Sequence, residues 1–246
     1  MNQNLPMSDY MAFLLEKLPY LLIGFPGYRP GGLLLSLLLA IVAIVLGFGI
    51  ALPISRGYES PRRPLHWSAR LYVEVFRGLP LILLLLLVHQ VVGSPRFGLD
   101  LSPRASALAA LTLYSSAYQA EILRAGLRSV PRGLVESARL MGSTPWQIYR
   151  LVKLRYAVRV MLPAFTGQAI SLFKDTSVVL IIGVAELMTT ARVALGNDVA
   201  NAPYWVGIYL LAGFLYFWVA FGLSQLAQRW ERRTQTSDLV YSLANY

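Results

Sequence analysis

The feature that most constrains this chain is residues 33–52, a run of 20 residues without a charged side chain. A helix rises about 1.5 Å per residue, so a run of this length covers the ~30 Å hydrocarbon core of a bilayer. Backbone amides in hydrocarbon need partners within their own segment, and a helix supplies them. The run therefore predicts a transmembrane helix.

The composition places the whole chain in the same class. Hydrophobic residues make up 56% of the 246 residues, charged residues only 14%, and the mean hydropathy is +0.54. A soluble domain of this length needs more charge to cover its surface. We predict an all-α, polytopic membrane protein, with further spans at residues 72–92, 105–123, 160–182 and 204–226.

The basic residues predict the orientation of these five spans. Residues 56–77 contain five Lys or Arg, residues 124–159 contain eight, and three more follow residue 228. The segments on the opposite side contain only five. Basic residues favour the cytoplasmic side, which puts the N-terminus outside and the C-terminus in the cytoplasm. This distribution in short segments between apolar runs also argues against nucleic acid as the reason for the net charge of +10.

The segment before the first span has a different character. Residues 7–23 include Glu16 and Lys17 and are too short and too charged to span, which indicates an interfacial helix rather than a secretory signal peptide. We therefore divide the chain into an interfacial or periplasmic segment (1–32), a transmembrane domain (33–228) and a cytoplasmic tail (229–246). The transmembrane domain includes a cytoplasmic loop, 128–157.

That cytoplasmic loop has the sequence of a defined structure. Helix-forming residues follow Gly133, and Gly142 is a typical stop signal. Thr144, Pro145 and Gln147 then match an N-cap, a first helical residue and the reciprocal partner of a capping box. The pattern predicts a short helix, a sharp turn and a second helix that returns to the membrane. A rigid helix outside the bilayer can transmit force to a partner.

Three motifs in and before this loop carry a resemblance. Tyr118-Gln-Ala-Glu-Ile-Leu-Arg124, Ser129-Val-Pro-Arg-Gly133, and Glu136-Ser-Ala138 with Gly142 resemble the coupling loop of permease subunits from binding-protein-dependent ABC importers. The resemblance is to the polar amino acid family, which includes histidine, glutamine and glutamate/aspartate permeases. Val75-Phe-Arg-Gly-Leu-Pro80 and Phe173-Lys-Asp-Thr-Ser177 agree with the same family.

The resemblance implies a set of partners in a bacterial inner membrane. Two permease subunits form the pathway, an external amino-acid-binding protein delivers the substrate, and a cytoplasmic ABC ATPase dimer binds ATP and Mg²⁺. This chain would bind no cofactor itself. Its coupling residues would be Gly133, Glu136, Ser137, Ala138 and Gly142, with small side chains at 137 and 138 letting the helix enter an ATPase cleft.

The chain departs from the family pattern at three positions. Leu134 replaces a common glutamine, Ser137 replaces an alanine, and Arg155 stands where a proline is frequent. Without that proline, the sequence does not determine whether the chain bends before the fourth span. These departures favour a non-identical second permease subunit over an identical one.

Polar residues inside the spans are candidates for the substrate pathway, because a charge there costs about 2.5–3.5 kcal/mol. Lys174, Asp175, Thr176 and Ser177 interrupt the fourth span and either line the pathway, with the helix unwound there, or form an interhelical hydrogen-bond set. Near the end of the third span, Tyr118 and Glu121 lie one helical turn apart. Glu121 is expected to pair with Arg124 or Arg77 rather than contact substrate.

No pattern of an enzyme is present. The sequence has no cysteine, no histidine cluster that would bind a metal, and no phosphate-binding loop. It therefore predicts a transport subunit that takes its energy from a partner. The alternative is a self-sufficient secondary transporter of small zwitterionic solutes, which the small number of spans and the lack of a visible inverted repeat disfavour. Which amino acid is carried stays open.

Overall fold

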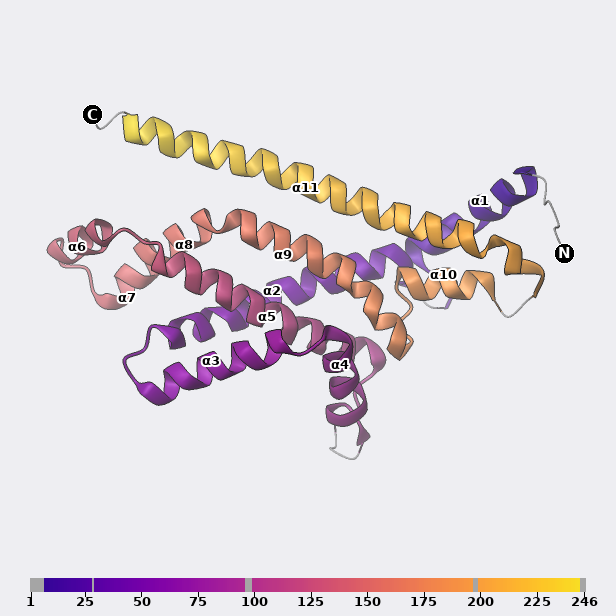
Figure 1. The fold of residues 1–246 in the computed structure, drawn as a ribbon, viewed down its shortest axis with the longest axis horizontal. Helices are drawn as coiled ribbons and strands as arrows, with labels where there is room; N and C mark the ends of the chain where they lie inside the picture. Colours follow the sequence, from indigo (N-terminus) through magenta and orange to yellow (C-terminus); the bar gives the residue numbers. More distant parts are fainter. Residues whose placement is uncertain (1–6, 28, 96–98, 197–198, 244–246) are drawn as a thin grey trace. The chain divides into compact units, whose positions relative to one another are not determined.

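The computed structural model describes residues 7–27, 29–95, 99–196 and 199–243, and this part of the chain is helical without a β-strand (Figure 1). Short π-helical or 3₁₀ segments continue several helices. The α-helices are α1 (Met7–Ile23), α2 (Gly32–Tyr58), α3 (Arg63–Gly78), α4 (Leu81–Leu86), α5 (Pro103–Arg128), α6 (Arg132–Leu140), α7 (Pro145–Gln147), α8 (Leu154–Val160), α9 (Leu162–Asp175), α10 (Leu187–Leu195) and α11 (Trp205–Leu243).

Helices long and apolar enough to cross a membrane occur where the hydropathy predicts most of the spans. They are α2, the segment Leu162–Ile182, and Trp205–Glu231 within α11. A bent pair, Arg63–Gly78 with Leu81–Val92, adds a fourth candidate. Helix α5 is long enough, with 26 residues, but it is more polar than these. The described residues thus form an α-helical protein with three helices that are long and apolar enough to span a membrane, or four if the bent pair is one span.

The second predicted span, residues 72–92, is not one continuous helix. Helix α3 ends at Gly78, and Leu79 adopts an extended conformation with φ −83° and ψ 133°. Pro80 is the cause, because a proline disfavours helical geometry in the residue before it and supplies no N–H. After the break the chain continues as α4 and a π-helical segment, Leu87–Val92.

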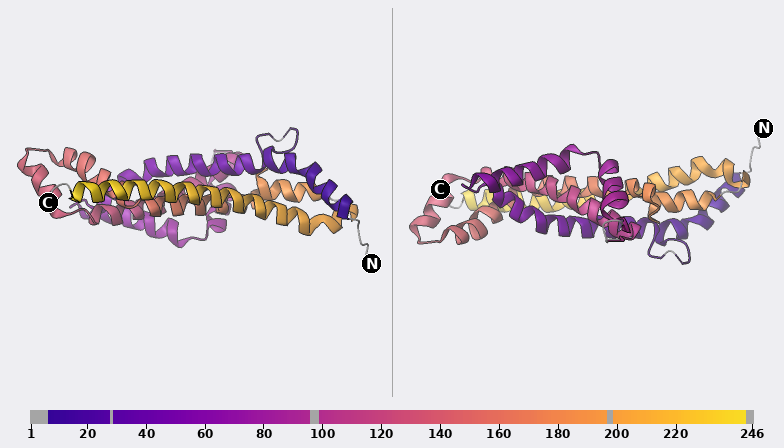
Figure 2. Two further views of the ribbon diagram at one scale, coloured as in Figure 1. Left: turned by 90° about the horizontal axis from the view of Figure 1, so that it is seen from above. Right: turned by 90° about the horizontal axis from the view of Figure 1, so that it is seen from below.

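Two other predicted spans differ at their ends. The α-helix α9 stops at Asp175 and tightens into a 3₁₀ segment, Thr176–Ile182. Helix α11 continues to Leu243 without interruption, so the predicted tail boundary at residue 229 lies inside a helix (Figures 1 and 2). The first span and the helix predicted at residues 7–23 agree with α2 and α1.

The chain forms two compact units, and each is made of three separate stretches of sequence. The first unit contains Met1–Ala43, Leu81–Leu111 and Ser171–Gly222. The second contains Ile44–Pro80, Thr112–Ile170 and Leu223–Tyr246.

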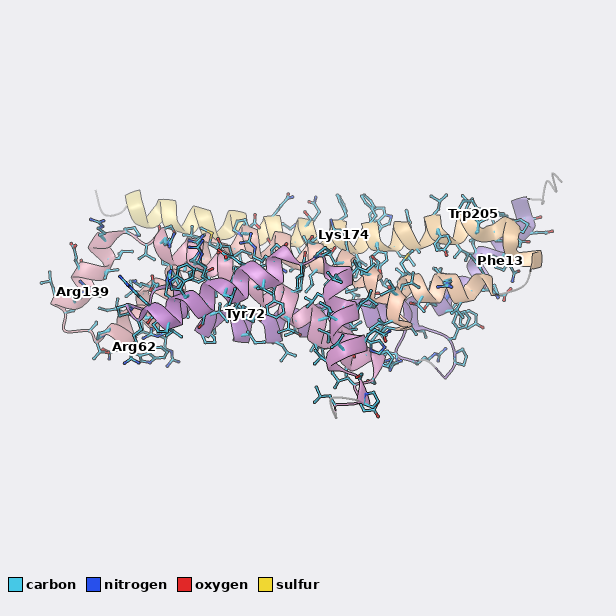
Figure 3. All side chains as sticks on the ribbon, turned by 60° about the horizontal axis from the view of Figure 1, so that its bottom comes forward. Phe13, Arg62, Tyr72, Arg139, Lys174 and Trp205 are labelled. Carbon is cyan, nitrogen blue, oxygen red and sulfur yellow. The ribbon has the colours of Figure 1, made fainter. Side chains whose placement is uncertain are left out.

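The core of the first unit joins α1, α2, α10 and α11. Its buried side chains include Leu21, Ala40, Phe173, Leu187 and Ile208. Phe13 of α1 stacks on Tyr204 with ring centroids 4.1 Å apart, beside the start of α11, and Figure 3 labels Phe13 and Trp205 in this region. Helix α1 therefore packs as part of the unit.

The core of the second unit lies between α2, α3 and α5. Ala51, Val73, Ala120 and Leu123 are buried together there. A smaller cluster of Leu127, Tyr149 and Ala157 connects the end of α5 to the segment that follows α6. The segment Ile148–Lys153, which contains Tyr149, in turn packs against α6.

Candidate functional site

Helix α6 is terminated as the sequence predicts. Gly142 has φ +77°, a conformation that glycine adopts at little cost. Its N–H donates to Arg139 O at 2.9 Å, and Ser143 N–H donates to Ala138 O at 3.1 Å. These two bonds form a Schellman motif, which satisfies the last carbonyls of the helix and reverses the chain.

The helix that follows begins with the predicted capping box. Gln147 N–H donates to Thr144 Oγ1 at 3.3 Å, and Thr144 N–H donates to Gln147 Oε1 at 2.8 Å. Pro145 occupies the first helical position. Because both ends of the turn are fixed by local hydrogen bonds, α6 is a rigid projection rather than a mobile loop. Arg139, near its end, is labelled in Figure 3.

The exposed face of α6 differs from the expected one. Ala138 is only 3% exposed, so its small side chain lets α6 pack against its own chain and is not open to a partner as predicted. Leu140 and Met141 are 89% and 79% exposed, and sequence reasoning did not select them. Gly133, Glu136, Ser137 and Gly142 are exposed, as a contact surface requires.

The chain breaks its helix at the start of the fourth span, before Pro163 rather than at position 155. Arg155 lies inside α8, where the helix is regular. The break comes at Met161, which ends α8 with φ −92° and ψ 8°, directly before α9 and its Pro163. Pro163 has no N–H to donate back into α8, which explains a break here without a proline at 155.

The polar segment of the fourth span lies in the first unit. Asp175 is the last residue of α9, and the backbone changes to 3₁₀ geometry at Thr176. Thr176 is fully buried and donates to Phe173 O at 2.7 Å, while Ser177 donates to Lys174 O at 2.9 Å. Lys174 is exposed. Both hydroxyls satisfy local carbonyls, so the segment is a tightened turn of helix with charged groups beside it.

Tyr118 and Glu121 belong to the second unit, whereas residues 174–177 belong to the first. Glu121 accepts from Arg124 Nε at 2.8 Å and also from its Nη2, and it lies 3.7 Å from Arg77 Nη1. The Arg77 guanidinium lies over the Tyr118 ring, 5.1 Å from its centroid. The hydrogen bond to Glu121 raises the pKa of Arg124 above its ordinary value. Glu121 thus forms the predicted ion pair with both alternative partners.

A buried carboxylate was missed by the sequence analysis. Glu186 has no exposed surface and caps α10, accepting from Met188 N–H at 2.9 Å and Thr189 N–H at 2.8 Å. Tyr216 of α11 donates to it at 2.8 Å, and Ser36 of α2 donates at 3.4 Å. The signal is an acidic residue before a helix-forming run, in the connection between the predicted spans 160–182 and 204–226.

Glu186 therefore holds three helices together. Its donors come from α2, α10 and α11, and α10 packs against the 3₁₀ segment that carries Thr176 and Ser177. A fully buried carboxylate is tolerated only when it is hydrogen-bonded, as it is here. The cluster positions the polar turn of the fourth span.

Comparisons with known proteins agree with this geometry. The family described as "Binding-protein-dependent transport system inner membrane component" matches residues 43–235. The glutamate/aspartate import permease protein GltK of Escherichia coli O6:H1 is 35% identical over 229 residues, covering 90% of this chain and 96% of GltK. The probable glutamine ABC transporter permease protein GlnP of Bacillus subtilis is 35% identical, covering 82% of this chain and 91% of GlnP.

A solved structure shares both fold and sequence. A crystal structure of an amino acid ABC transporter with histidines is 30% identical, with a TM-score of 0.73, covering 92% of this chain and 96% of the other. Members of the matching family are transport subunits rather than enzymes. The family match covers most of the sequence, and the relatives match over nearly their whole length, so the chain belongs to the inner membrane components of binding-protein-dependent transport systems.

Proposed function

We propose that this chain is the permease subunit of an ABC importer for polar amino acids in a bacterial inner membrane. The observation that carries the proposal is α6, a helix fixed at its C-terminal end that presents Leu140 and Met141 outward. Such a projection is suited to docking in a cleft of an ATPase. The relatives' names, which refer to glutamate, aspartate and glutamine, support the substrate class.

The proposed topology has five spans, with the N-terminus outside and the C-terminus in the cytoplasm. Its support is the five apolar segments that hydropathy predicts as spans, at residues 33–52, 72–92, 105–123, 160–182 and 204–226. The excess of basic residues in 56–77, 124–159 and the C-terminal segment supports the orientation.

The proposed partners follow from this function. A cytoplasmic ATPase dimer binds ATP and Mg²⁺ and receives α6, while Gly133, Glu136, Ser137 and Gly142 form the surface around Leu140 and Met141. A second permease subunit completes the pathway, and we expect it to be a different chain. An external binding protein delivers the amino acid. Counting permease polypeptides in the purified complex tests the heterodimer.

For the substrate pathway we propose the polar turn at Lys174, Asp175, Thr176 and Ser177. Its support is the change from α- to 3₁₀-helix at Asp175, next to an exposed lysine. Tyr118 and Glu121 are given a structural role instead, because Glu121 is already paired with two arginines.

Reconstituted transport tests the function. The permease, its ATPase and its binding protein are placed in proteoliposomes, and uptake of labelled glutamate, aspartate, glutamine, arginine and histidine is measured with and without internal ATP. We expect ATP-dependent uptake of at least one of these, reduced by Asp175→Asn at equal protein level. Uptake that persists without the ATPase and follows an ion gradient would instead establish a secondary transporter.

A further inference from the structure

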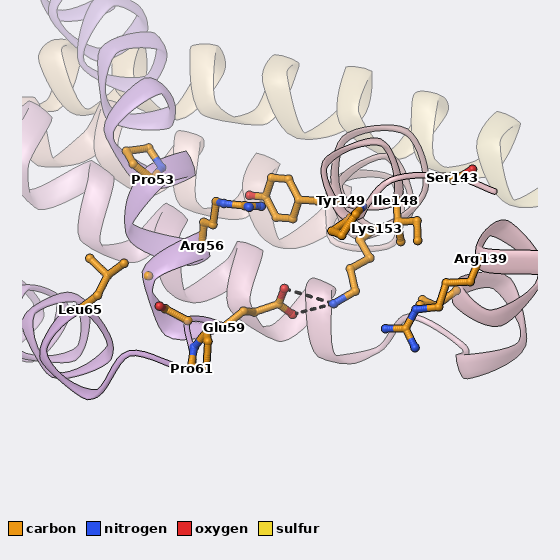
Figure 4. A pocket seen from close by; sticks show the side chains of 14 residues that line it. Pro53, Arg56, Glu59, Pro61, Leu65, Arg139, Ser143, Ile148, Tyr149 and Lys153 are labelled. Carbon is orange, nitrogen blue, oxygen red and sulfur yellow. Dashed lines mark hydrogen bonds and ion pairs between the residues drawn. The ribbon is translucent and has the colours of Figure 1, made fainter.

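A cavity of about 750 Å³ in the second unit lies between the end of α2, the start of α3 and the α6 region (Figure 4). This volume falls within the range of about 300–1,000 Å³ that small-molecule sites occupy. The function proposed above uses the outer face of α6, whereas Val135 and Arg139 of α6 line this cavity from the other direction. The cavity therefore requires a separate explanation.

The charges around this cavity do not balance. Arg56, Arg139 and Lys153 line it, and Glu59 is the single carboxylate among its lining residues. Lys153 Nζ lies 3.1 and 3.2 Å from the two carboxylate oxygens of Glu59, so this pair neutralises itself. In the described part of the chain, neither Arg56 nor Arg139 forms an ion pair. Two positive charges are left without an anion.

Arg56 is held in a fixed orientation. Its guanidinium lies 4.7 Å from the ring centroid of Tyr149 and 5.2 Å from that of Trp146, an arrangement that stabilises a cation without neutralising it. Figure 4 shows Arg56 against Tyr149 on one wall and Arg139 reaching toward Lys153 from the other. Arginine in such a setting binds oxyanions, and phosphate in particular, through paired N–H groups.

The position of the cavity indicates where the anion comes from. The first predicted span ends at Leu52, and Arg56, the first charged residue after it, follows four residues later, about 6 Å further along the helix axis. On the proposed topology this is the depth of the cytoplasmic headgroups, where basic pockets between helices bind anionic lipids. Pro53, Leu65 and Ile148 give the cavity an apolar wall suited to a glycerol backbone and the first acyl carbons.

We propose that this cavity binds the phosphate ester of an anionic phospholipid headgroup, through Arg56 and Arg139. Because these residues belong to α2 and α6, the bound phosphate braces the coupling helix against the transmembrane helix beside it. The membrane depth and the coupling role rest on the proposed function, whereas anion binding by the cavity does not. A soluble phosphate ester offers the same chemistry, and the experiment separates the two sources.

The test measures lipid binding to the full-length permease, purified without its partners in a nonionic detergent. Native mass spectrometry compares dihexanoylphosphatidylglycerol, dihexanoylphosphatidylcholine and glycerol 3-phosphate. The variants are Arg56→Gln and Arg139→Gln, with Arg150→Gln as the control because Arg150 is exposed in the same segment and does not line the cavity. The exposed Arg139 side chain forms no ion pair in the described part of the chain, so Arg139→Gln remains informative if Arg56→Gln is unstable.

We expect phosphatidylglycerol to bind more tightly than phosphatidylcholine. Arg139→Gln should weaken the binding of phosphatidylglycerol about fivefold, which is the effect of one basic residue at a membrane surface. Arg139→Lys keeps the charge but lacks the paired N–H groups, so it restores only part of the binding, and Arg150→Gln leaves the binding unchanged. If glycerol 3-phosphate competes with the lipid at an equal concentration, the cavity is an anion site, and its ligand is a soluble phosphate ester rather than a lipid.

Two results would overturn the proposal. The first is equal binding of the two lipids, or wild-type binding by Arg139→Gln. The second is that added ATPase displaces the lipid, while Arg139→Gln weakens binding of the ATPase and not of the lipid. This result would mean that the cavity binds an acidic side chain of the ATPase. The binding measurement needs neither transport nor ATP, so its failure is distinct from a failure of the proposed function.

Discussion

At Gly47 of α2, an added Cβ would lie 3.0 Å from Gln119 Nε2 and 3.1 Å from the Ser116 backbone nitrogen of α5. Gln119 is 1% exposed and donates to Ile44 O at 3.0 Å and Ser115 Oγ at 2.8 Å. The glycine therefore allows α2 and α5 to approach closely enough for a buried amide to join them. Small residues in α2 predict such an approach, but only the structure identifies the partner helix.

Gly47→Ala should destabilise the second unit, because the new methyl group must displace backbone and a hydrogen-bonded amide. We expect a cost of about 1–3 kcal/mol, typical of overpacking. It is measured as a lower Tm of the purified protein. Gly49→Ala is the control, since an added Cβ there meets no described atom within 4 Å. Equal Tm values for the two variants would show that the contact is unimportant.

Single residues differ in how far the sequence could place them. The Glu121–Arg124 pair was predictable because both residues lie on one helix at a separation of three. The partners of Glu186 were not, because its carboxylate accepts hydrogen bonds from Ser36 and Tyr216, which are 150 and 30 residues away. Ala138 was given an outward role that only the packing of α6 could correct.

Among the elements, the caps of α6 and α7 were predicted and the break in the second span was missed. A Schellman motif and a capping box are local patterns, so their residues alone determine them. Pro80 is the local signal for that break, but the span was placed by hydropathy, which carries no information on where a helix bends. The same limit applies to the change from α- to 3₁₀-helix at Thr176.

Docking of α6 depends on the two exposed apolar side chains at its end. The double variant Leu140→Ser with Met141→Ser should reduce co-purification of the ATPase at least tenfold, because buried anchors of this type provide most of an interface's affinity. Leu99→Ser is the control, since Leu99 is also exposed, at 53%, but lies outside the coupling segment. Normal ATPase recovery with the double variant would place the docking surface elsewhere.

The end of α6 should be sensitive to the residue at position 142. Gly142→Ala places a Cβ in a conformation with φ +77° and should cost about 1–2 kcal/mol locally. We expect a lower rate of ATP-driven uptake at normal expression. Gly142→Asn should retain more activity, because asparagine tolerates this conformation better. Equal uptake by both variants would remove Gly142 from the coupling mechanism.

At the scale of the whole molecule, hydropathy predicted the membrane class and most spans, but not their relation to the two compact units. Helix α5 illustrates the reason. It buries Ala110, Ser115, Ser116 and Gln119, so it needs less apolar surface than a helix that faces lipid. Residues 105–123 were predicted as a span, but the grouping of this segment with distant ones depends on contacts that no single segment encodes.

The orientation can be tested directly because the chain contains no cysteine. Ser60→Cys, between α2 and α3, should react with a membrane-impermeant maleimide only after cells are permeabilised. Ser94→Cys, after the π-helical segment, should react in intact cells. The opposite pattern would reverse the topology, and reaction of both residues in intact cells would mean that residues 61–93 do not cross the membrane.

The interleaving of the two units has a consequence for synthesis. Each unit needs sequence from early, middle and late parts of the chain, and Leu223–Tyr246 contributes to the second only after Ser171–Gly222 has completed the first. A ribosome must therefore release nearly the whole polypeptide before either unit has all its segments. Nascent helices remain in the bilayer until their partner segments are made, and a product that ends before Ser171 lacks segments of both units.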